Sequence, residues 1–152
     1  ARHNPNAEIV AGDWQNVLAV ASDNATKAGI GNRYRTFEGS AFEVEFGEGY
    51  DFVMLTNFLH HFNPETNQSL LRKVHRALQP GGRAVTLEFV PDNDRLTPPM
   101  AAEFSLIMLA STPEGDAYTF PELEQMFSNA GFHSAHLHEI PPSIERVVIS
   151  SK

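Results

Sequence analysis

Residues 50–62 read YDFVMLTNFLHHF, a nearly unbroken apolar run that ends in two histidines. The part from Tyr50 to Leu59 has the composition expected of a strand that is buried on both faces of a parallel sheet. Strand-like and helix-like patterns alternate on both sides of this run, which is typical of an α/β sheet. The sequence therefore predicts an α/β fold, with polar groups where this strand ends.

The other elements are predicted outward from this run. Asn63 has the character of a helix N-cap with Pro64 at the first helical position, and the turn Pro80-Gly81-Gly82 is expected to end that helix. Two strands at the end of the chain are expected to form an antiparallel pair at one sheet edge. The remaining predicted strands are 7–14, 34–39 and 83–90, the closing pair is 135–140 and 146–150, and the remaining helices are 16–28, 101–110 and 121–129.

Composition limits the classes of function. The chain has 152 residues, enough for one domain with a substantial core. Its 11 Lys and Arg against 19 Asp and Glu give a net charge of -8, which argues against a nucleic-acid partner because phosphate binding needs a basic face. The absence of cysteine excludes disulfides and thiolate chemistry. No apolar run approaches the ~18 residues of a membrane span, so no membrane partner is expected.

The ends of the first two predicted strands carry candidate ligand-binding groups, because open α/β sheets bind ligands outside the carboxyl ends of their strands. Asp13 can accept two hydrogen bonds from a ribose diol, and as an alternative it can cap the following helix. Gly39 and Ala41 leave room for a flat ring, Phe42 can cover one face of that ring, and Ser40 can bond a ring amine. A plain core role for Phe42 is the alternative.

The candidates for chemistry lie further along. His60 and His61 follow the long apolar strand, and a neutral imidazole is the natural base near pH 7. Glu88 lies in the otherwise apolar segment 85–90, and a buried carboxylate there needs a partner, for which a histidine would serve. As an alternative, the two histidines can be ordinary residues at the edge of a loop, and Glu88 can lie at an exposed strand tip. Three further histidines, His133, His136 and His138, are expected to lie at the surface rather than bind a metal.

The order of these segments is more specific than any one of them. It resembles the motif series of class I S-adenosylmethionine-dependent methyltransferases, and in particular the bacterial relatives of the plant and antibiotic-pathway O-methyltransferases. The segments that carry the resemblance are 12–14, 39–42, 50–51, 59–62, 78–83, 86–91, 115–120 and 130–132. It implies a Rossmann-like methyltransferase sheet that is mostly parallel with an antiparallel edge hairpin.

The resemblance also implies roles for individual residues. Asp13 and Trp14 would lie at the ribose of S-adenosylmethionine, Ser40, Ala41 and Phe42 around its adenine, and Thr56 and Asn57 on its methionine side. His60 would act as the general base and Glu88 would orient it. A second orienting carboxylate would fall near Ala117, where the nearest acid is Asp116. No metal is implied.

Part of the family pattern is not matched. The family's first strand and glycine-rich loop, and its N-terminal dimerisation domain, have no counterpart in residues 1–152, which are therefore expected to be a partial catalytic domain. Without a central strand the sheet has unpaired edges, so this polypeptide alone is expected to fold poorly and to bind the cofactor weakly. For the full-length protein the resemblance implies a cytoplasmic homodimer.

The implied function is methyl transfer from S-adenosylmethionine to a hydroxyl of a small aromatic or secondary-metabolite molecule. Methylation at carbon or nitrogen on the same scaffold, and a truncated non-catalytic module, are the open alternatives. A nicotinamide oxidoreductase would also bind its cofactor at the strand ends of an α/β sheet. This alternative lacks support, because no glycine-rich dinucleotide fingerprint lies between a predicted strand and a predicted helix.

Overall fold

The computed structural model describes residues 3–152, which form two compact units, one up to Phe46 and the other Gly47–Lys152. In the first unit, two parallel strands, β1 (Ile9–Asp13) and β2 (Tyr34–Glu38), are joined by helix α1 (Gln15–Lys27) and a 3-10 turn. Helix α1 buries Leu18 and Ala25, and the chain leaves it through Gly29 at φ 72°, a backbone conformation that glycine adopts without strain. This βαβ unit aligns Asp13 with Glu38, so both strands end together.

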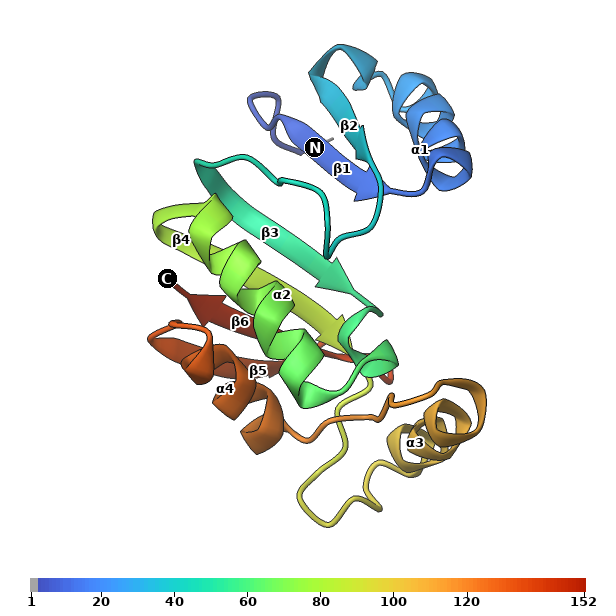
Figure 1. Ribbon diagram of the computed structural model, residues 1–152. Helices are drawn as coiled ribbons and strands as arrows, with labels where there is room; N and C mark the ends of the chain where they lie inside the picture. Colours follow the sequence, from blue (N-terminus) through green and yellow to red (C-terminus); the bar gives the residue numbers. More distant parts are fainter. Residues whose placement is uncertain (1–2) are drawn as a thin grey trace. The chain divides into compact units, whose positions relative to one another are not determined.

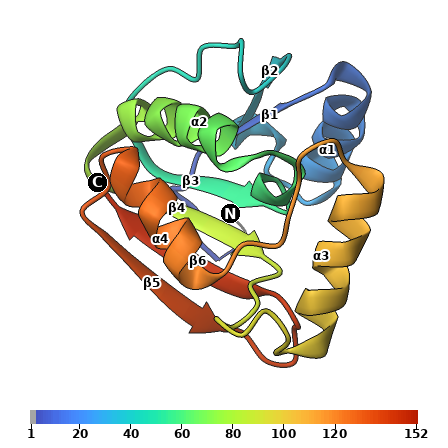
Figure 2. The same cartoon turned by 60° about the horizontal axis from the view of Figure 1, so that its bottom comes forward.

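The second unit is a four-stranded sheet with the order β3-β4-β6-β5 (Figure 1). Strands β3 and β4 are parallel, whereas β6 is antiparallel to both β4 and β5. Helices α2 and α4 lie over one face of this sheet (Figures 1 and 2). The elements of this unit are β3 (Tyr50–Thr56), a 3-10 turn (Leu59–His61), α2 (Pro64–Ala77), β4 (Leu78–Glu88), α3 (Pro99–Ser111), α4 (Phe120–Asn129), β5 (Ser134–Glu139) and β6 (Arg146–Ser151).

Local sequence signals start the two covering helices. Asn63 Oδ1 accepts a hydrogen bond from the Thr66 N–H at 2.8 Å, and Pro64 opens α2, as predicted. Helix α4 begins with a capping box between Thr119 and Glu122. Both helices then bury an apolar stripe on the sheet, formed by Leu70, Leu71, Val74 and Ala77 in α2 and by Leu123, Met126 and Phe127 in α4.

The α/β class and the antiparallel edge hairpin are confirmed, but three details of the prediction are wrong. Helix α2 already ends at Ala77, and the turn Pro80-Gly81-Gly82 lies within β4 (Leu78–Glu88) rather than at the end of the helix. Strand β3 ends at Thr56 rather than Leu59, because Asn57 takes a left-handed φ of 52° and the chain then enters a 3-10 turn. Strand β3 is also not buried on both faces. It is an edge strand among the described residues, which leaves Phe52 59% and Met54 69% exposed.

The strand pairing of the described residues also agrees with the implied additional strand. Strand β1 pairs only with β2 and β3 only with β4 in the part of the chain that the structure describes. Each therefore keeps one edge whose backbone N–H and C=O groups have no strand partner.

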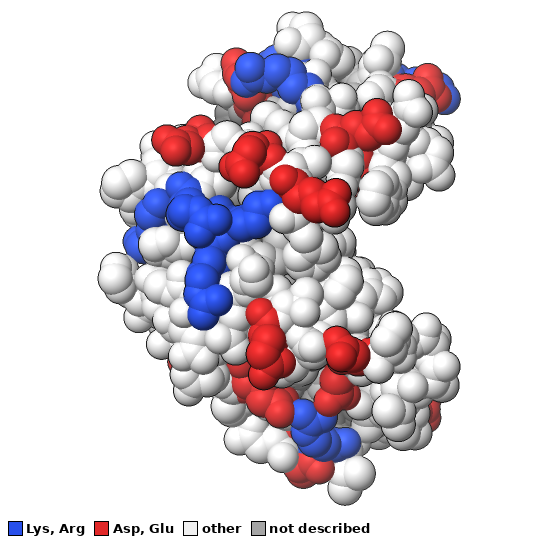
Figure 3. All heavy atoms as spheres, in the orientation of Figure 1, with Lys and Arg blue, Asp and Glu red and all other residues white. Residues whose placement is uncertain are grey.

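Across residues 3–152, no helix is both long enough and apolar enough to cross a membrane. On the face shown in Figure 3, acidic and basic side chains alternate with wide uncharged areas.

Candidate active site

The end of β4 is joined to the turn after β3 by one buried hydrogen bond. Glu88 Oε2 lies 2.5 Å from His60 Nδ1, and the two residues are only 4% and 5% exposed. An ionised carboxylate can only accept hydrogen bonds, so Nδ1 carries the proton in this contact. The Nε2 atom of His60 then keeps a lone pair, which is what a general base requires. The sequence-based pairing of Glu88 with a histidine is present in the structure, whereas the roles of both residues stay predictions.

Glu88 also holds the backbone beside His60. Its Oε1 accepts hydrogen bonds from the N–H groups of Phe58 at 2.9 Å and Leu59 at 2.8 Å. We call residues 58–62 the histidine loop. The Glu88 carboxylate thus fixes both the backbone at the start of the histidine loop and the ring of His60. Glu88 is therefore buried and paired, and it is not an exposed strand tip.

The two adjacent histidines differ in environment. The rings of His60 and His61 lie 4.3 Å apart between centroids, but only His60 contacts Glu88 through a hydrogen bond. His61 is largely exposed, and its pKa is lowered from the ordinary value by partial burial and by the neighbouring His60, against an opposing effect of Glu88. The structure therefore distinguishes His60 as the oriented imidazole of the pair.

An aromatic stack from helix α3 covers the ring of His60. Phe104 meets the imidazole edge-on at 4.8 Å between centroids and stacks on Phe89 at 4.0 Å. Met108 is buried on the same helix, whereas Leu106 and Leu109 are exposed. Helix α3 thus supplies an aromatic neighbour to the candidate base.

In the first unit, the pairing of β1 with β2 brings Asp13 next to Gly39, the residue before Ser40. The carbonyl of Asp13 accepts a hydrogen bond from Gly39 N–H at 3.1 Å. Asp13 Oδ1 accepts from Trp14 N–H at 2.7 Å, while Oδ2 has no hydrogen-bond partner among the described residues. The helix N-cap is Trp14, so Asp13 does not cap α1. A carboxylate oxygen at a strand end therefore stays available to a ligand, with the indole of Trp14 59% exposed beside it.

The predicted adenine segment forms a tight turn. The carbonyl of Ser40 accepts hydrogen bonds from the N–H groups of Glu43 and Val44, both at 3.0 Å, and Ser40 Oγ accepts from Phe42 N–H at 3.3 Å. Ser40, Ala41 and Phe42 are all partly exposed. Phe42 is therefore not a plain core residue, and the turn leaves the segment accessible at the end of β2.

Thr56 and Asn57 lie at the end of β3, and both are exposed. The Asn57 N–H donates to the Leu87 carbonyl at 2.9 Å, which keeps this strand end paired with β4. These two residues belong to the same unit as His60 and Glu88.

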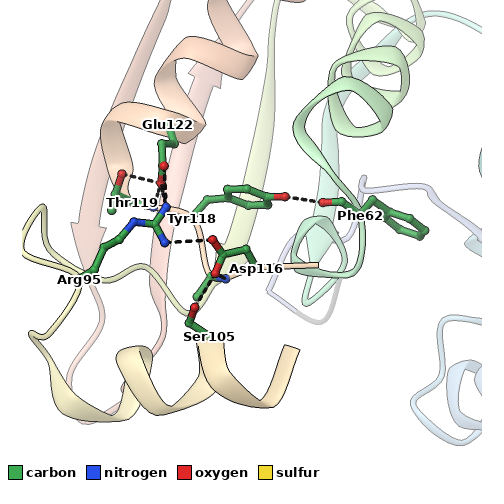
Figure 4. A network of polar contacts seen from close by, with 8 residues as sticks. Phe62, Arg95, Ser105, Asp116, Tyr118, Thr119 and Glu122 are labelled. Atoms are coloured by element: carbon green, nitrogen blue, oxygen red, sulfur yellow. Dashed lines mark hydrogen bonds and ion pairs between the residues drawn. The ribbon is translucent and has the colours of Figure 1, made fainter. Parts of the chain in front are cut away.

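A polar network beside the histidine loop was not foreseen from the sequence (Figure 4). Arg95 binds Asp116 at 2.9 Å and both Glu122 oxygens at 2.5 and 2.7 Å, and Ser105 Oγ donates to the second Asp116 oxygen. Burial raises the pKa of Glu122, but hydrogen bonds from Thr119 and Arg95 outweigh it and leave that pKa below its ordinary value. The Thr119-x-x-Glu122 spacing was the one readable signal.

Asp116 contacts the loop through its backbone and not through its carboxylate. Its N–H donates to the His60 carbonyl at 3.1 Å, while its side chain is bound to Arg95 and Ser105. The adjacent Gly115 has no room for a side chain, because a Cβ atom would lie 2.3 Å from the His60 oxygen. Asp116 thus holds the histidine loop without orienting the imidazole.

No group of three or more His, Asp or Glu side chains gathers as a potential metal site within residues 3–152. His136 and His138 lie on the outer strand β5, and both are exposed, as is His133 just before it.

Asp13 and Glu88 lie at the carboxyl ends of parallel strands, which is where open α/β sheets bind ligands. The family model of the O-methyltransferase domain matches residues 1–133. This chain belongs to the O-methyltransferase domain family.

Individual relatives agree with that family. A solved structure of a putative O-methyltransferase from Nostoc punctiforme is 54% identical with a TM-score of 0.98, over 100% of this chain and 47% of that one. PigF of Serratia sp., an S-adenosyl-L-methionine-dependent methyl transferase, is 32% identical over 78% of this chain and 34% of its own length. The structure of PigF with SAH matches with a TM-score of 0.86 at 29% identity, over 99% of this chain and 45% of that one.

A third relative, L-tyrosine C(3)-methyltransferase of Streptomyces lavendulae, is 30% identical over 88% of this chain and 37% of its own length. The chain thus spans about a third of these curated relatives and about half of the matching solved structures.

Proposed function

We propose that the protein to which this chain belongs transfers the methyl group of S-adenosylmethionine to a hydroxyl of a small aromatic molecule. The observation that carries the proposal is the buried His60–Glu88 pair, in which Nδ1 is bound and Nε2 is left as a base. The family match and the relative named as an S-adenosyl-L-methionine-dependent methyl transferase support the cofactor.

The residues of the first unit fit the nucleoside part of this cofactor. A ribose diol offers two O–H donors, and Asp13 presents a carboxylate whose Oδ2 has no hydrogen-bond partner among the described residues. Trp14 offers an exposed indole next to it, and the turn at Ser40–Phe42 offers a partly exposed hydroxyl and ring. When bound, S-adenosylmethionine supplies an already activated sulfonium methyl group, so the protein mainly has to align the acceptor and take its proton.

The residues of the second unit act on the acceptor. A phenol becomes a good nucleophile only when its proton leaves, and His60 Nε2 would take that proton. Glu88 holds the ring in the required tautomer and stabilises the imidazolium that forms. Phe104 and Phe89 keep the ring in an apolar setting, where an aromatic acceptor can stack.

A second candidate is methylation at an aromatic carbon. It is favoured by one observation, the 30% identity to a relative named L-tyrosine C(3)-methyltransferase. A phenolate made by His60 carries negative charge on its ring carbons as well as on its oxygen, so the same base serves both reactions. The product alone distinguishes them. The homodimer and the cytoplasmic location implied by the family resemblance stay predictions.

The cofactor assignment is tested by calorimetric titration of the full-length protein with S-adenosylhomocysteine. Asp13→Ala removes the charge-assisted hydrogen bonding to the ribose, a loss of about 1.5–3 kcal/mol in total, so we expect the Kd to rise by about 10- to 100-fold. Glu38→Ala is the matched control, because it removes the same charge from the end of the neighbouring strand. Equal effects of the two variants would mean that Asp13 acts only through its charge and does not contact the ribose.

A further inference from the structure

Asn67 is a fully buried polar residue in an otherwise apolar stripe of helix α2. Its Nδ2 donates two hydrogen bonds, to the Leu59 carbonyl at 2.8 Å and to the Phe62 carbonyl at 3.1 Å. These two carbonyls flank His60 and His61, so one amide group bridges both sides of the histidine pair.

The other polar atom of this amide is unsatisfied. Asn67 Oδ1 is buried and has no hydrogen-bond partner among the described residues. A buried acceptor without a partner is unfavourable, and a leucine at this position would avoid it. The unsatisfied Oδ1 atom of Asn67 destabilises the fold. The favourable contribution of this side chain therefore comes from the two hydrogen bonds that its Nδ2 donates to the histidine loop.

Tyr118 provides a second donor at the same place. Its hydroxyl donates to the Phe62 carbonyl at 2.5 Å, from the segment that precedes α4 (Figure 4). Burial, together with the nearby Asp116 and Glu122 carboxylates, raises the pKa of Tyr118 to about 12, so its hydroxyl stays protonated as a donor. The Phe62 oxygen thus accepts from both Tyr118 and Asn67.

We infer that Asn67 and Tyr118 are positioning residues that set the orientation of His60 by clamping the carbonyls of the histidine loop. Glu88 fixes the imidazole at Nδ1 and the two N–H groups before it, while Asn67 and Tyr118 fix the carbonyls on either side. The direction of Nε2 toward an acceptor therefore depends on both sets of contacts. The consequence for turnover rests on the proposed function, whereas the consequence for the His60 ring does not.

Either member of the clamp can be removed alone while each of the two carbonyls keeps a hydrogen-bond donor. In Asn67→Leu, the Leu59 oxygen keeps the Phe62 N–H at 3.2 Å and the Phe62 oxygen keeps the Tyr118 hydroxyl. In Tyr118→Phe, the Phe62 oxygen keeps the Asn67 amide. Only the double variant leaves the Phe62 oxygen with neither side-chain donor.

The test measures kinetics and the His60 ring in the full-length protein. We expect Asn67→Leu to lower kcat by about 10- to 100-fold, as for a catalytic group misplaced by about 1 Å, with the KM for S-adenosylmethionine unchanged. Tyr118→Phe should lower kcat less, and the double variant more than the product of the two single effects. The imidazole resonances of His60, assigned by their loss in His60→Ala, should shift or broaden in Asn67→Leu.

Ser150→Ala is the matched control, since it also removes a fully buried polar atom that has no partner among the described residues, but on β6. It should leave both kcat and the His60 resonances unchanged. An unchanged His60 spectrum in the double variant would overturn the inference, whether or not methyl transfer is observed. A shifted spectrum with no methyl transfer by the parent protein would keep the clamp and reject the proposed function.

Discussion

His60→Ala in the full-length protein is expected to lower kcat by about 10²- to 10⁴-fold, the usual contribution of a positioned general base. His60 Nδ1 is bound to Glu88, so the free Nε2 is the atom that would accept the acceptor's proton. The affinity for S-adenosylhomocysteine should stay the same, because the residues proposed to bind its nucleoside part lie on β1 and after β2. Steady-state kinetics and calorimetry measure the two quantities.

His61→Ala is the matched control for this variant. His61 is adjacent in sequence and its ring contacts His60, but it does not share the Glu88 carboxylate. We expect less than about a tenfold effect on kcat, because it makes no contact that holds a proton-accepting nitrogen in place. Unchanged turnover in His60→Ala would remove this residue from the reaction and indicate an acceptor that is deprotonated without it.

Glu88→Gln should reduce kcat nearly as much as His60→Ala while the protein stays folded. The side-chain oxygen of glutamine can still accept from the Phe58 and Leu59 N–H groups, but its NH₂ group then faces His60 Nδ1. An amide NH₂ can only donate, so the imidazole is driven to the tautomer with its proton on Nε2 and can no longer act as a base. Kinetics combined with a thermal melt separates this effect from unfolding.

Glu88→Leu is the variant that measures the structural role of the same carboxylate. It leaves the buried donors of Phe58, Leu59 and His60 without their partner, and because each buried donor left unsatisfied costs about 1–3 kcal/mol, we expect a total loss of about 3 kcal/mol or more. The free energy of unfolding should fall by about that amount in urea denaturation. A small loss of stability together with a small loss of turnover would show that Glu88 is not the anchor of the loop.

The sequence predicted the fold well where local chemistry dictates structure. The Asn63–Pro64 start of α2 and the antiparallel pair β5–β6 need no information from distant residues. The end of β3 was placed too late, because Phe58 and Leu59 continue the apolar pattern but leave the strand to donate to Glu88. Hydrophobic periodicity reports burial and cannot report the hydrogen-bond partner that turns the backbone.

The sequence indicated individual candidate residues of the site, but it did not indicate most of the hydrogen bonds and ion pairs that join them. A lone acid in an apolar strand indicated that Glu88 needs a partner, and the histidine pair offered one. No sequence pattern distinguishes Asn67, because its bonds to Leu59 and Phe62 depend on how the turn before the helix folds back. Arg95 pairs with acids 21 and 27 residues away, a distance at which spacing carries no signal.

The most direct measurement of the central claim is methyl transfer by the full-length protein from isotope-labelled S-adenosylmethionine to a panel of small phenols. NMR spectroscopy of the products then shows which atom carries the methyl group. The account predicts a methyl ether on the phenol oxygen, formed by the wild-type protein and lost in His60→Ala. Transfer to ring carbon alone would contradict the hydroxyl assignment, and no transfer combined with no binding of S-adenosylhomocysteine would favour a non-catalytic module.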